Sequence, residues 1–526
     1  MCNKKHLFTS HLSLSLINMH IDARKLPDNS VITGDICIVG AGAAGISMAL
    51  ELKNSGKKII LLEGGGFEYD EQVQELYAGT STGQKYFPLK SARLHMFGGT
   101  TGHWSGYCST FDDIDFEERP WVKHSGWPIT RADLEPYYPK AQQYLQLGPY
   151  QYNLEYWQKK DAALVPLVNN EVVWNKMWQF SPPTRFGEVY RNEIVRSPDI
   201  HLYTYANVTD IRATENLAAV KELVVKNHAG KTHRVRAKNF VLACCSIQTA
   251  RLLLASNTQN PKGLGNDHDN VGRYFMEHLE IKSAELWLTK PSRWKLYELE
   301  FGVTPSRAEL AITAAQQRKH EILNGTSSLS TLAESRNRKA IIEMWSDEDP
   351  RKSLKALKEG FADDPEIEQA PDKNRGYQLF TRIEQAPNPD SRVTLAKEVD
   401  SLGMPRAHLH WELTPLDKRS VRKIYELIGQ QVGGHGIGLV KMFDYLHDEN
   451  DPSWPAYTGG GWHHMGTTRM SSDPKQGVVD SNCKVHTLSN LYIGGASCFT
   501  TAGAANPTLT LVALAARLAE HLGKKA

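Results

Sequence analysis

The sequence predicts an α/β protein built on a Rossmann-like nucleotide-binding domain, and three observations carry this prediction. The chain has 526 residues, which is too long for one ordinary core and indicates two domains or one domain with a substantial insertion. A strand, a glycine-rich turn and a helix follow one another near the start of the chain. A short strand, a loop and an amphipathic helix come near its end.

The composition excludes several classes of protein. Hydrophobic residues make up 40% of the chain and charged residues 23%, which is typical of a globular protein. The formal net charge of +2 gives no electrostatic basis for binding nucleic acid, and no apolar run approaches the roughly 20 residues of a membrane span. Seven cysteines without CxxC spacing predict neither a disulfide framework nor a metal site, and they fit a reducing, cytoplasmic compartment.

Residues 1–32 are predicted to form an N-terminal extension. Two lysines precede a mildly apolar stretch there, in the order of a signal peptide, so export to the periplasm is the alternative. Serines and histidines interrupt that stretch, and no small-residue cleavage site follows it. An extension, with Met19 as a second candidate start, is therefore the favoured interpretation.

The first chemical motif is GAGAAG, which directly follows a buried strand. Its first glycine permits a tight turn, the second lets backbone approach a pyrophosphate, and the third lets the helix pack on the strand. The next strand ends at Glu63, where a carboxylate suits a ribose hydroxyl and disfavours a 2′-phosphate, so FAD or NAD is indicated. The cofactor-binding residues predicted in this unit are Gly40, Gly42, Ala43, Ala44, Gly45, Glu63 and Gly64.

Two further segments bear on the choice between FAD and NAD. FGGTTGHWSG, residues 97–106, is a turn-forming stretch where backbone can run close to a flat ligand. Near the end of the chain, Asn506 suits an N-cap and Pro507 suits the first position of a helix. Such a helix start would stabilise negative charge on a reduced flavin. A final helix that only closes the core is the alternative, and periodicity does not separate the two.

The chain resembles the glucose–methanol–choline (GMC) flavin oxidoreductases from about residue 33 to residue 522. The matching pieces occur in family order and include IVGAGAAG, GGTTGHWSG, GWPITRADLEPYY, VLACCSIQTARLLLAS, GLGNDHDNVGRYFMEH, EQAPNPDSRVTL, HHMGTTRM and NLYIGGASCFTTAGAANPTLT. The sequences of these motifs are most similar to those of the bacterial sugar-oxidising branch and of pyranose oxidases.

The resemblance implies a GMC fold, in which a discontinuous FAD-binding domain is interrupted by a substrate domain with an antiparallel sheet. It assigns residues 33–115, 195–282 and 455–526 to the FAD-binding domain. It assigns residues 116–194 and 283–454 to the substrate domain.

The resemblance also assigns a catalytic pair. In this family the catalytic histidine lies four residues before the threonine of a Gly-Thr pair, which is Gly466–Thr467 here, so His463 is the expected base. The partner position in the last motif holds Asn506. Hydride leaves an alcohol readily only as its oxygen approaches an alkoxide, so a base must reach the hydroxyl, and a neutral amide can hold the same oxygen. His464 is expected to point elsewhere if the segment is extended.

His103 occupies the position that is bonded covalently to the flavin ring in pyranose oxidase and choline oxidase. A bond of that kind and a histidine that only packs beside the flavin are the two alternatives. The other cofactor-binding residues that the resemblance implies are Gly98, Gly99, Thr100, Trp104, Ser105, Val208, Ala243, Ala496, Asn506, Pro507 and Thr508.

Three features depart from the family or have two interpretations. Cys244–Cys245 replaces a small residue and glycine, and buried small hydrophobes are favoured over a redox-active pair. Residues 307–375 are interpreted as an exposed, charged helical insertion, with docking of a small partner subunit or the next protomer as the alternative. Four tryptophans of the substrate domain suit sugar stacking but are more simply core residues: Trp157, Trp174, Trp178 and Trp287.

Together these observations predict an FAD-dependent oxidation of a secondary CHOH group in a sugar, glycoside or related polyol, giving the ketone. The electron acceptor stays open between oxygen and a quinone-like or protein acceptor. Two alternatives remain: a lyase of the same fold that keeps FAD as structure, and a flavin-binding subunit of a multi-subunit dehydrogenase. Homo-oligomers and a small partner subunit are both compatible with the sequence.

Overall fold

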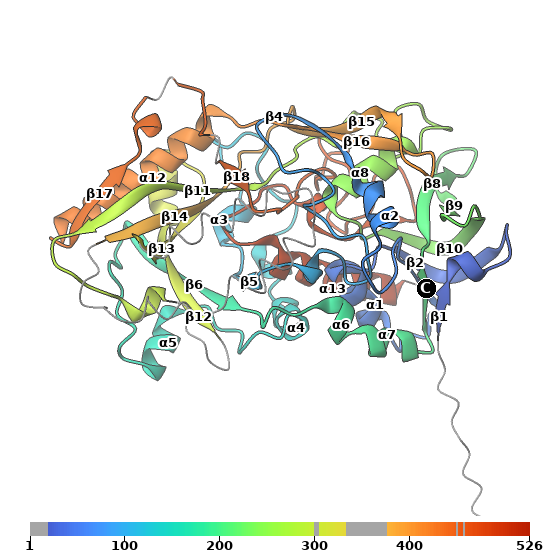
Figure 1. Cartoon of the computed structure of the whole chain (residues 1–526), viewed down its shortest axis with the longest axis horizontal. Helices are drawn as coiled ribbons and strands as arrows, with labels where there is room; N and C mark the ends of the chain where they lie inside the picture. The colour runs from blue at the N-terminus through green and yellow to red at the C-terminus, as the bar shows by residue number, and fades with distance from the viewer. Residues whose placement is uncertain (1–18, 299–304, 333–375, 449–450, 456–457, 526) are drawn as a thin grey trace, which may run out of the picture.

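The computed structural model describes residues 19–298, 305–332, 376–448, 451–455 and 458–525. Two large sheets lie toward opposite ends of an elongated molecule, and helices and loops from several parts of the chain fill the middle (Figure 1). The C-terminus lies beside the first of these sheets. Among the described residues, no helix is both long enough and apolar enough to span a bilayer.

The first sheet has eight strands in the described part of the chain, ordered β1-β7-β3-β2-β10-β9-β8, with β19 also paired to β10. The ladders from β1 to β10 and between β10 and β19 are parallel, whereas β9 pairs antiparallel with both β10 and β8. The strands are β1 (His20–Asp22), β2 (Val31–Val39), β3 (Ile59–Leu62), β7 (Ile200–Thr204), β8 (Asn207–Ala213), β9 (Val220–Lys226), β10 (Thr232–Leu242) and β19 (Leu491–Ile493).

The register of this sheet brings four chain segments to one edge. Val39 pairs with both Leu62 and Leu242, and Leu242 pairs with Ile493. Four parallel strands therefore end at the same level, and the loops that leave them start side by side. In open α/β sheets, ligands bind outside the carboxyl ends of the strands, so this edge is where a nucleotide site is expected.

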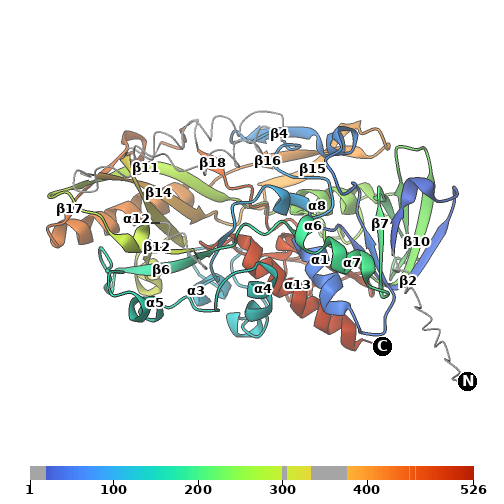
Figure 2. The same ribbon diagram turned by 60° about the horizontal axis from the view of Figure 1, so that its bottom comes forward.

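Helices pack around this sheet and close its core. The helix α1 (Ala43–Leu52) leaves β2 directly, and α13 (Pro507–Lys524) packs against both α1 and α4 (Tyr138–Tyr144), as Figure 2 shows. The helix α8 (Ser246–Ala255) follows β10 and contacts β8. The inner face of α13 is apolar and fully buried, which fixes its first turn at the strand ends.

The second sheet also has eight strands within the described residues, ordered β17-β11-β14-β13-β12-β6-β5, with β18 paired to β11. All its ladders are antiparallel. The strands are β5 (Tyr107–Cys108), β6 (Val173–Phe180), β11 (His278–Leu288), β12 (Ser306–Ile312), β13 (Gly325–Thr331), β14 (Gly376–Glu384), β17 (Gly438–Met442) and β18 (Gly459–Gly460). The long helix α12 (Pro415–Gly434) packs on β17, β12 and β6.

A smaller sheet and several short helices complete the fold. The third sheet consists of β15 (Arg392–Val399), β16 (Pro405–Trp411) and β4 (Gly79–Gly83), and it contacts α8. The remaining α-helices within the described residues are α2 (Glu71–Gln74), α3 (Asp113–Phe116), α5 (Leu154–Lys160), α6 (Phe186–Val189), α7 (Arg191–Arg196) and α9 (Ala314–His320).

The structure differs from the predicted segmentation in three places. Residues 20–22 and 31–32, assigned to the N-terminal extension, form β1 and the start of β2 in the first sheet. The boundary predicted at residue 283 falls inside β11, because one strand of the second sheet runs from His278 to Leu288.

The third difference concerns the insertion predicted at residues 307–375. Its first part forms β12, α9 and β13, which are core elements of the second sheet, and residues 333–375 lie outside the described part. The physical reason is that β13 reads GTSSLST and is buried although mostly polar. Its hydroxyls find partners in neighbouring strands: Thr326 donates to Glu309, and Ser327 bonds Thr381. Hydropathy alone does not predict a buried strand of this kind.

Candidate functional site

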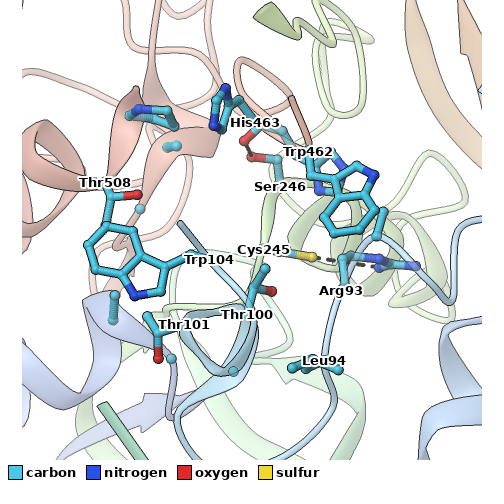
Figure 3. Close-up of a pocket in the computed structure, with 18 of the residues that line it drawn as sticks. Arg93, Leu94, Thr100, Thr101, Trp104, Cys245, Ser246, Trp462, His463 and Thr508 are labelled. Carbon is cyan, nitrogen blue, oxygen red and sulfur yellow. Dashed lines mark hydrogen bonds between the residues drawn. The ribbon is translucent and has the colours of Figure 1, made fainter. Parts of the chain in front are cut away.

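A cavity of about 520 Å³ is lined by both large sheets and by the segments between them. The carboxyl ends of β2, β3, β10 and β19 form one end of it, and β11, β12 and β14 contribute to the other end. Figure 3 shows His463 and Trp462 on one side of this cavity, with Thr100 and Thr101 on the opposite side. A ligand that fills the cavity would therefore contact the nucleotide-binding edge and the His463 region together.

The glycine turn after β2 has the geometry that its motif predicts. Gly40 has a φ of +101°, and a Cβ there would meet Ala243 O at 2.8 Å. A Cβ on Gly45 would lie 1.9 Å from Gly40 O, so the missing side chain lets α1 pack on the turn. A Cβ on Gly42 would meet no protein atom within 4 Å, and this residue lines the cavity. The open space beside its backbone is suited to a phosphate group.

Glu63 lines the cavity at the end of β3, but its carboxylate already has backbone partners. Oε2 accepts the N–H of Ala41 at 3.0 Å, and Oε1 accepts the N–H of Gly65 at 2.9 Å. Burial raises the pKa of this carboxyl above its ordinary value. The side chain therefore holds both neighbouring turns in place, and its contact with a ribose hydroxyl stays a prediction.

The second glycine segment forms a short helical turn over Gly99–Gly102 and supplies the opposite wall. Gly98, with φ of +96°, packs against Gly187 and donates its N–H to Ala41, so it supports the wall without lining the cavity. Trp104 lines the cavity and donates its indole N–H to Thr184 O at 2.9 Å.

Most of the sequence-predicted cofactor residues come together around this one cavity. Two do not line it, and these are Gly45 and Gly98, which act through packing. Those that line it are Gly40, Gly42, Ala43, Ala44, Glu63, Gly64, Gly99, Thr100, His103, Trp104, Ser105, Val208, Ala243, Ala496, Asn506, Pro507 and Thr508.

Buried polar atoms around the cavity fit a large polar cofactor. Among the described residues, both ring nitrogens of His103, Oδ1 of Asn506 and Oε1 of Gln248 are buried without a hydrogen-bond partner. All three residues line the cavity. Because buried polar atoms are stabilised by hydrogen-bond partners, these atoms are available to a ligand with donors and acceptors of its own. Burial also lowers the pKa of His103 to about 3, so its ring is neutral.

The base predicted at His463 is positioned by an irregular ladder beside β11. Leu279 pairs with Gly460, and Met276 pairs with Met465, so the segment from residue 460 to residue 465 has two more residues between these pairs than β11 and the residues before it. The extra length forms a bulge at Trp462, which lines the cavity and has a φ of +59°. A positive φ in a bulky residue stores strain, and such strain concentrates at functional sites. The bulge directs His463 into the cavity.

Both ring nitrogens of His463 have side-chain partners. Nε2 lies 3.1 Å from Nδ2 of Asn506, and Nδ1 lies 2.9 Å from Nδ1 of His278. The backbone N–H of His463 donates to Oε2 of Glu277 at 2.8 Å. Burial, followed by the nearby His278 and Arg382, lowers the pKa of His463 well below 6.5. The ring is therefore neutral and able to accept a proton near pH 7.

Asn506 occupies the N-cap position of α13, but its side chain makes no cap hydrogen bond. Its amide nitrogen turns to His463 instead. The first-turn N–H groups of α13 are therefore left to face the cavity, where they favour negative charge on a ligand.

His464 points away from its neighbour, as expected for the second residue of an extended pair. Its Nε2 lies 2.8 Å from the hydroxyl of Tyr86, which in turn bonds Glu277. Burial raises the pKa of Glu277 to about 8 and lowers that of His464 to about 3. This buried cluster supports the bulge from behind, because Glu277 also holds the backbone of His463.

Sequence reasoning missed the charged wall that the second sheet contributes. Glu280, Lys282, Arg307 and Arg382 line the cavity from β11, β12 and β14. Nε of Arg382 donates to Glu280 at 3.1 Å, and Arg307 donates to the buried Glu309 at 2.8 Å. These residues lie far apart in the chain, and only strand pairing brings them together.

The structure also shows where the four tryptophans and the Cys244–Cys245 pair lie. None of the four tryptophans predicted in the substrate domain lines the cavity, and Trp178 is fully buried while Trp287 is 43% exposed. The tryptophans that line it are Trp104 and Trp462. Cys244 and Cys245 both line the cavity, and both thiols are free. The sulfur of Cys245 lies 3.6 Å from Nη1 of Arg93.

Two family models match this chain. A model described as FAD dependent oxidoreductase matches residues 35–340, which is more than half of the chain. A model described as GMC oxidoreductase matches residues 387–515, the part that contains His463 and Asn506. The first match covers the glycine turn and the second covers the histidine bulge.

Individual proteins are similar over most of their length. The fructose dehydrogenase large subunit of Gluconobacter japonicus is 24% identical, over 94% of this chain and 98% of that protein. Pyranose 2-oxidase of Tricholoma matsutake is 25% identical, over 82% of this chain and 73% of that protein. The crystal structure of pyridoxine 4-oxidase from Mesorbium loti shares the fold, with a TM-score of 0.53 and 17% identity, over 93% of this chain and 98% of that one.

Proposed function

We propose that this chain, which belongs to the FAD-dependent oxidoreductases and has the C-terminal part of a GMC oxidoreductase, oxidises a secondary CHOH group of a sugar, glycoside or related polyol to the ketone. The observation that carries the proposal is the pair formed by His463 and Asn506. Their side-chain nitrogens lie 3.1 Å apart, and both residues line the cavity that the glycine turn after β2 also lines.

The pair can hold and deprotonate an alcohol. A substrate hydroxyl between the two side chains would give its proton to Nε2 of His463 while its oxygen accepts from Nδ2 of Asn506. Asn506 remains uncharged throughout, so it stabilises the developing alkoxide without competing for the proton. The neutral ring of His463 keeps the proton-accepting form populated at neutral pH. A positioned base of this kind accelerates proton transfer by about 10²- to 10⁴-fold.

The residues around the cavity divide the remaining tasks. FAD, when bound, would supply the hydride acceptor for the carbon-bound hydrogen. The glycine turn would hold the phosphates of FAD, and the first turn of α13 would stabilise negative charge on the reduced flavin. The charged wall of Glu280, Lys282, Arg307 and Arg382 offers several donors and acceptors to a substrate. Such a wall suits a molecule with many hydroxyl groups better than a long apolar alcohol.

The proposal is tested by anaerobic reduction of the bound flavin. D-fructose, D-glucose, methyl β-D-glucopyranoside and an aryl C-glucoside are mixed in turn with the FAD-loaded protein, and loss of flavin absorbance is followed. We expect at least one of them to bleach the flavin, and His463→Ala to bind FAD but bleach it at least about 100-fold more slowly. Absence of bleaching with all of them would favour a lyase that keeps FAD as structure.

A second candidate is a flavin-binding subunit of a multi-subunit dehydrogenase. The similarity to a protein named as a large subunit favours it, since the match extends over nearly all of both chains. The electron acceptor, oxygen or a quinone-like or protein acceptor, separates the candidates. Turnover by the purified chain with oxygen would count against the need for a partner, whereas bleaching that is reversed only by an added quinone or dye would favour it.

A further inference from the structure

One buried side chain, His278, contacts both His463 and the loop that leads to Asn506. It is the first residue of β11 and is completely buried. Its Nδ1 faces Nδ1 of His463 at 2.9 Å, and its Nε2 faces the carbonyl oxygens of Gly503 at 2.8 Å and Ala502 at 3.2 Å. The loop that contains these carbonyls leads three residues later to Asn506.

The carbonyl contacts decide where the proton of His278 lies. A carbonyl oxygen only accepts hydrogen bonds, so Nε2 of His278 must be the donor. Burial, with the charge of Arg382, lowers the pKa of His278 to about 3, so the ring carries a single proton near pH 7. Its Nδ1 is therefore a bare acceptor, and the hydrogen in the contact with His463 belongs to His463.

The proton on Nδ1 of His463 in turn leaves Nε2 of that ring unprotonated. Nδ2 of Asn506 is an amide donor and lies 3.1 Å from this nitrogen, which accepts from it. With both rings neutral, the opposite tautomer of His463 would place two lone pairs face to face across the 2.9 Å contact with His278. The three contacts thus select one tautomer of His463, with the lone pair of Nε2 directed at Asn506 on the cavity wall.

We infer that His278 is a positioning residue, which fixes the base-competent tautomer of His463 and ties its ring to the loop that carries Asn506. This inference rests on the proposed function only in naming Nε2 of His463 as the proton acceptor. When Nε2 takes a proton, Nδ1 keeps its own and donates to His278 as a charge-assisted hydrogen bond.

The loop that His278 holds is itself anchored from the second sheet. Oε2 of Glu384 accepts the N–H of Gly503 at 3.1 Å, and Oε1 of the same carboxylate is paired with Arg119 at 2.6 Å. Both charged side chains are almost fully buried. Gly503 has a φ of +58°, and a Cβ there would meet Oδ2 of Asp115 at 2.8 Å. A fixed loop gives His278 a fixed acceptor, so the orientation of its ring is set.

Other charged and titratable groups face the two rings and bear on any pH measurement. Arg382 disfavours a proton on either ring, and His464 disfavours one on His463. Glu277 accepts the backbone N–H of His463, and Glu280 bonds Arg382. These groups remain in place in the variants proposed below, so a change in behaviour is assigned to His278 itself.

The test reads the tautomer directly in the FAD-loaded protein labelled with [15N]histidine. The signals of His463 are assigned by their loss in His463→Gln. We expect the wild type to show a protonated Nδ1 and a bare Nε2 for His463 at pH 7. His278→Asn keeps an acceptor near the position of Nδ1 and is expected to keep this tautomer, whereas His278→Leu removes the acceptor and is expected to give a mixture.

The kinetic arm uses anaerobic flavin reduction by the same four sugars. His278→Leu is expected to reduce the flavin at least about tenfold more slowly at saturating sugar, with little change in the half-saturating concentration, and His278→Asn to recover most of the rate. A wild-type His463 protonated on Nε2, or a folded His278→Leu that reacts as fast as wild type, would overturn the inference. If His278→Leu does not fold, the wild-type and His278→Asn spectra still decide it. Absence of bleaching in the wild type would instead contradict the proposed function, and it would not affect the tautomer assignment.

Discussion

Two glycines of one turn are expected to fail in different ways when each is replaced by alanine. A Cβ on Gly45 would lie 1.9 Å from Gly40 O, whereas a Cβ on Gly42 would meet no protein atom within 4 Å. Contacts under 3.0 Å do not occur for real Cβ atoms, so Gly45→Ala must push backbone from backbone by about 1 Å. Gly42→Ala only places a methyl group in the cavity, where a pyrophosphate needs close access to the backbone.

The magnitudes follow from these contacts. Overpacking of this kind costs about 1–3 kcal/mol, and a rigid backbone partner places Gly45→Ala near the upper end. Alanine regains about 1 kcal/mol as a better helix former, which leaves a net loss of about 2 kcal/mol. Gly42 is the N-cap of α1, where alanine is less suitable than glycine by about 0.5–1 kcal/mol. The protein without FAD should therefore be clearly less stable with Gly45→Ala than with Gly42→Ala.

The assay combines flavin content with urea unfolding, with and without added FAD. A ligand that binds only the folded state raises the unfolding free energy, so FAD should stabilise wild type. It should stabilise Gly42→Ala much less, although that variant unfolds almost like wild type when FAD is absent. A Gly42→Ala protein that binds FAD as well as wild type would refute the assignment of the phosphate site. A Gly45→Ala protein as stable as wild type would refute the packing argument.

Three other predictions follow from the pKa shifts around the cavity. Because the pKa of His463 is lowered well below 6.5, the rate of flavin reduction should be constant from pH 6 to 7, below the pKa of about 8 of the neighbouring Glu277, and a titration near pH 6.5 would contradict this. His103 is neutral and its nitrogens lack partners among the described residues, so we predict that it bonds the flavin; acid-denatured wild type should keep flavin fluorescence in a gel band and His103→Ala should lose it. The pKa of Glu277 is raised from 4.5 to about 8, so the folded state binds its proton more tightly. The stability that this proton provides is full below pH 4.5 and declines up to about pH 8, and Glu277→Gln should flatten that part of the pH dependence of the urea midpoint.

The parts of the fold that depend on neighbouring residues could be predicted from sequence. The strand that ends at Val39, the turn at Gly40 and the helix that starts at Ala43 stand where GAGAAG places them. The last helix begins at Pro507 with Asn506 before it, as proline geometry and the capping preference predict. These signals act over a few residues, and they set where each element begins and ends.

The parts that depend on strand register could not be predicted in this way. His278 is the last residue of the motif GLGNDHDNVGRYFMEH. Nothing in the spacing of this motif indicates that His278 faces His463, which is 185 residues later in the chain. That contact needs the pairing of β18 with β11 and two extra residues in the bulge. Glu280 and Arg382 also meet only because β11 and β14 are adjacent. Single-sequence periodicity does not contain this register.

Two residues that break local rules meet at the cavity. Asn506 stands at an N-cap yet does not cap its helix, and Trp462 adopts a φ of +59° that bulky side chains avoid. Each departure costs free energy locally, about 1 kcal/mol for a missing cap and of order 1–3 kcal/mol for the strained backbone. Both have the same consequence, since one directs an amide at Nε2 of His463 and the other directs that ring into the cavity. Packing around Glu277, His278 and the buried Glu384 holds the two departures together, and for this reason the chemistry depends on the second sheet as much as on the nucleotide-binding sheet.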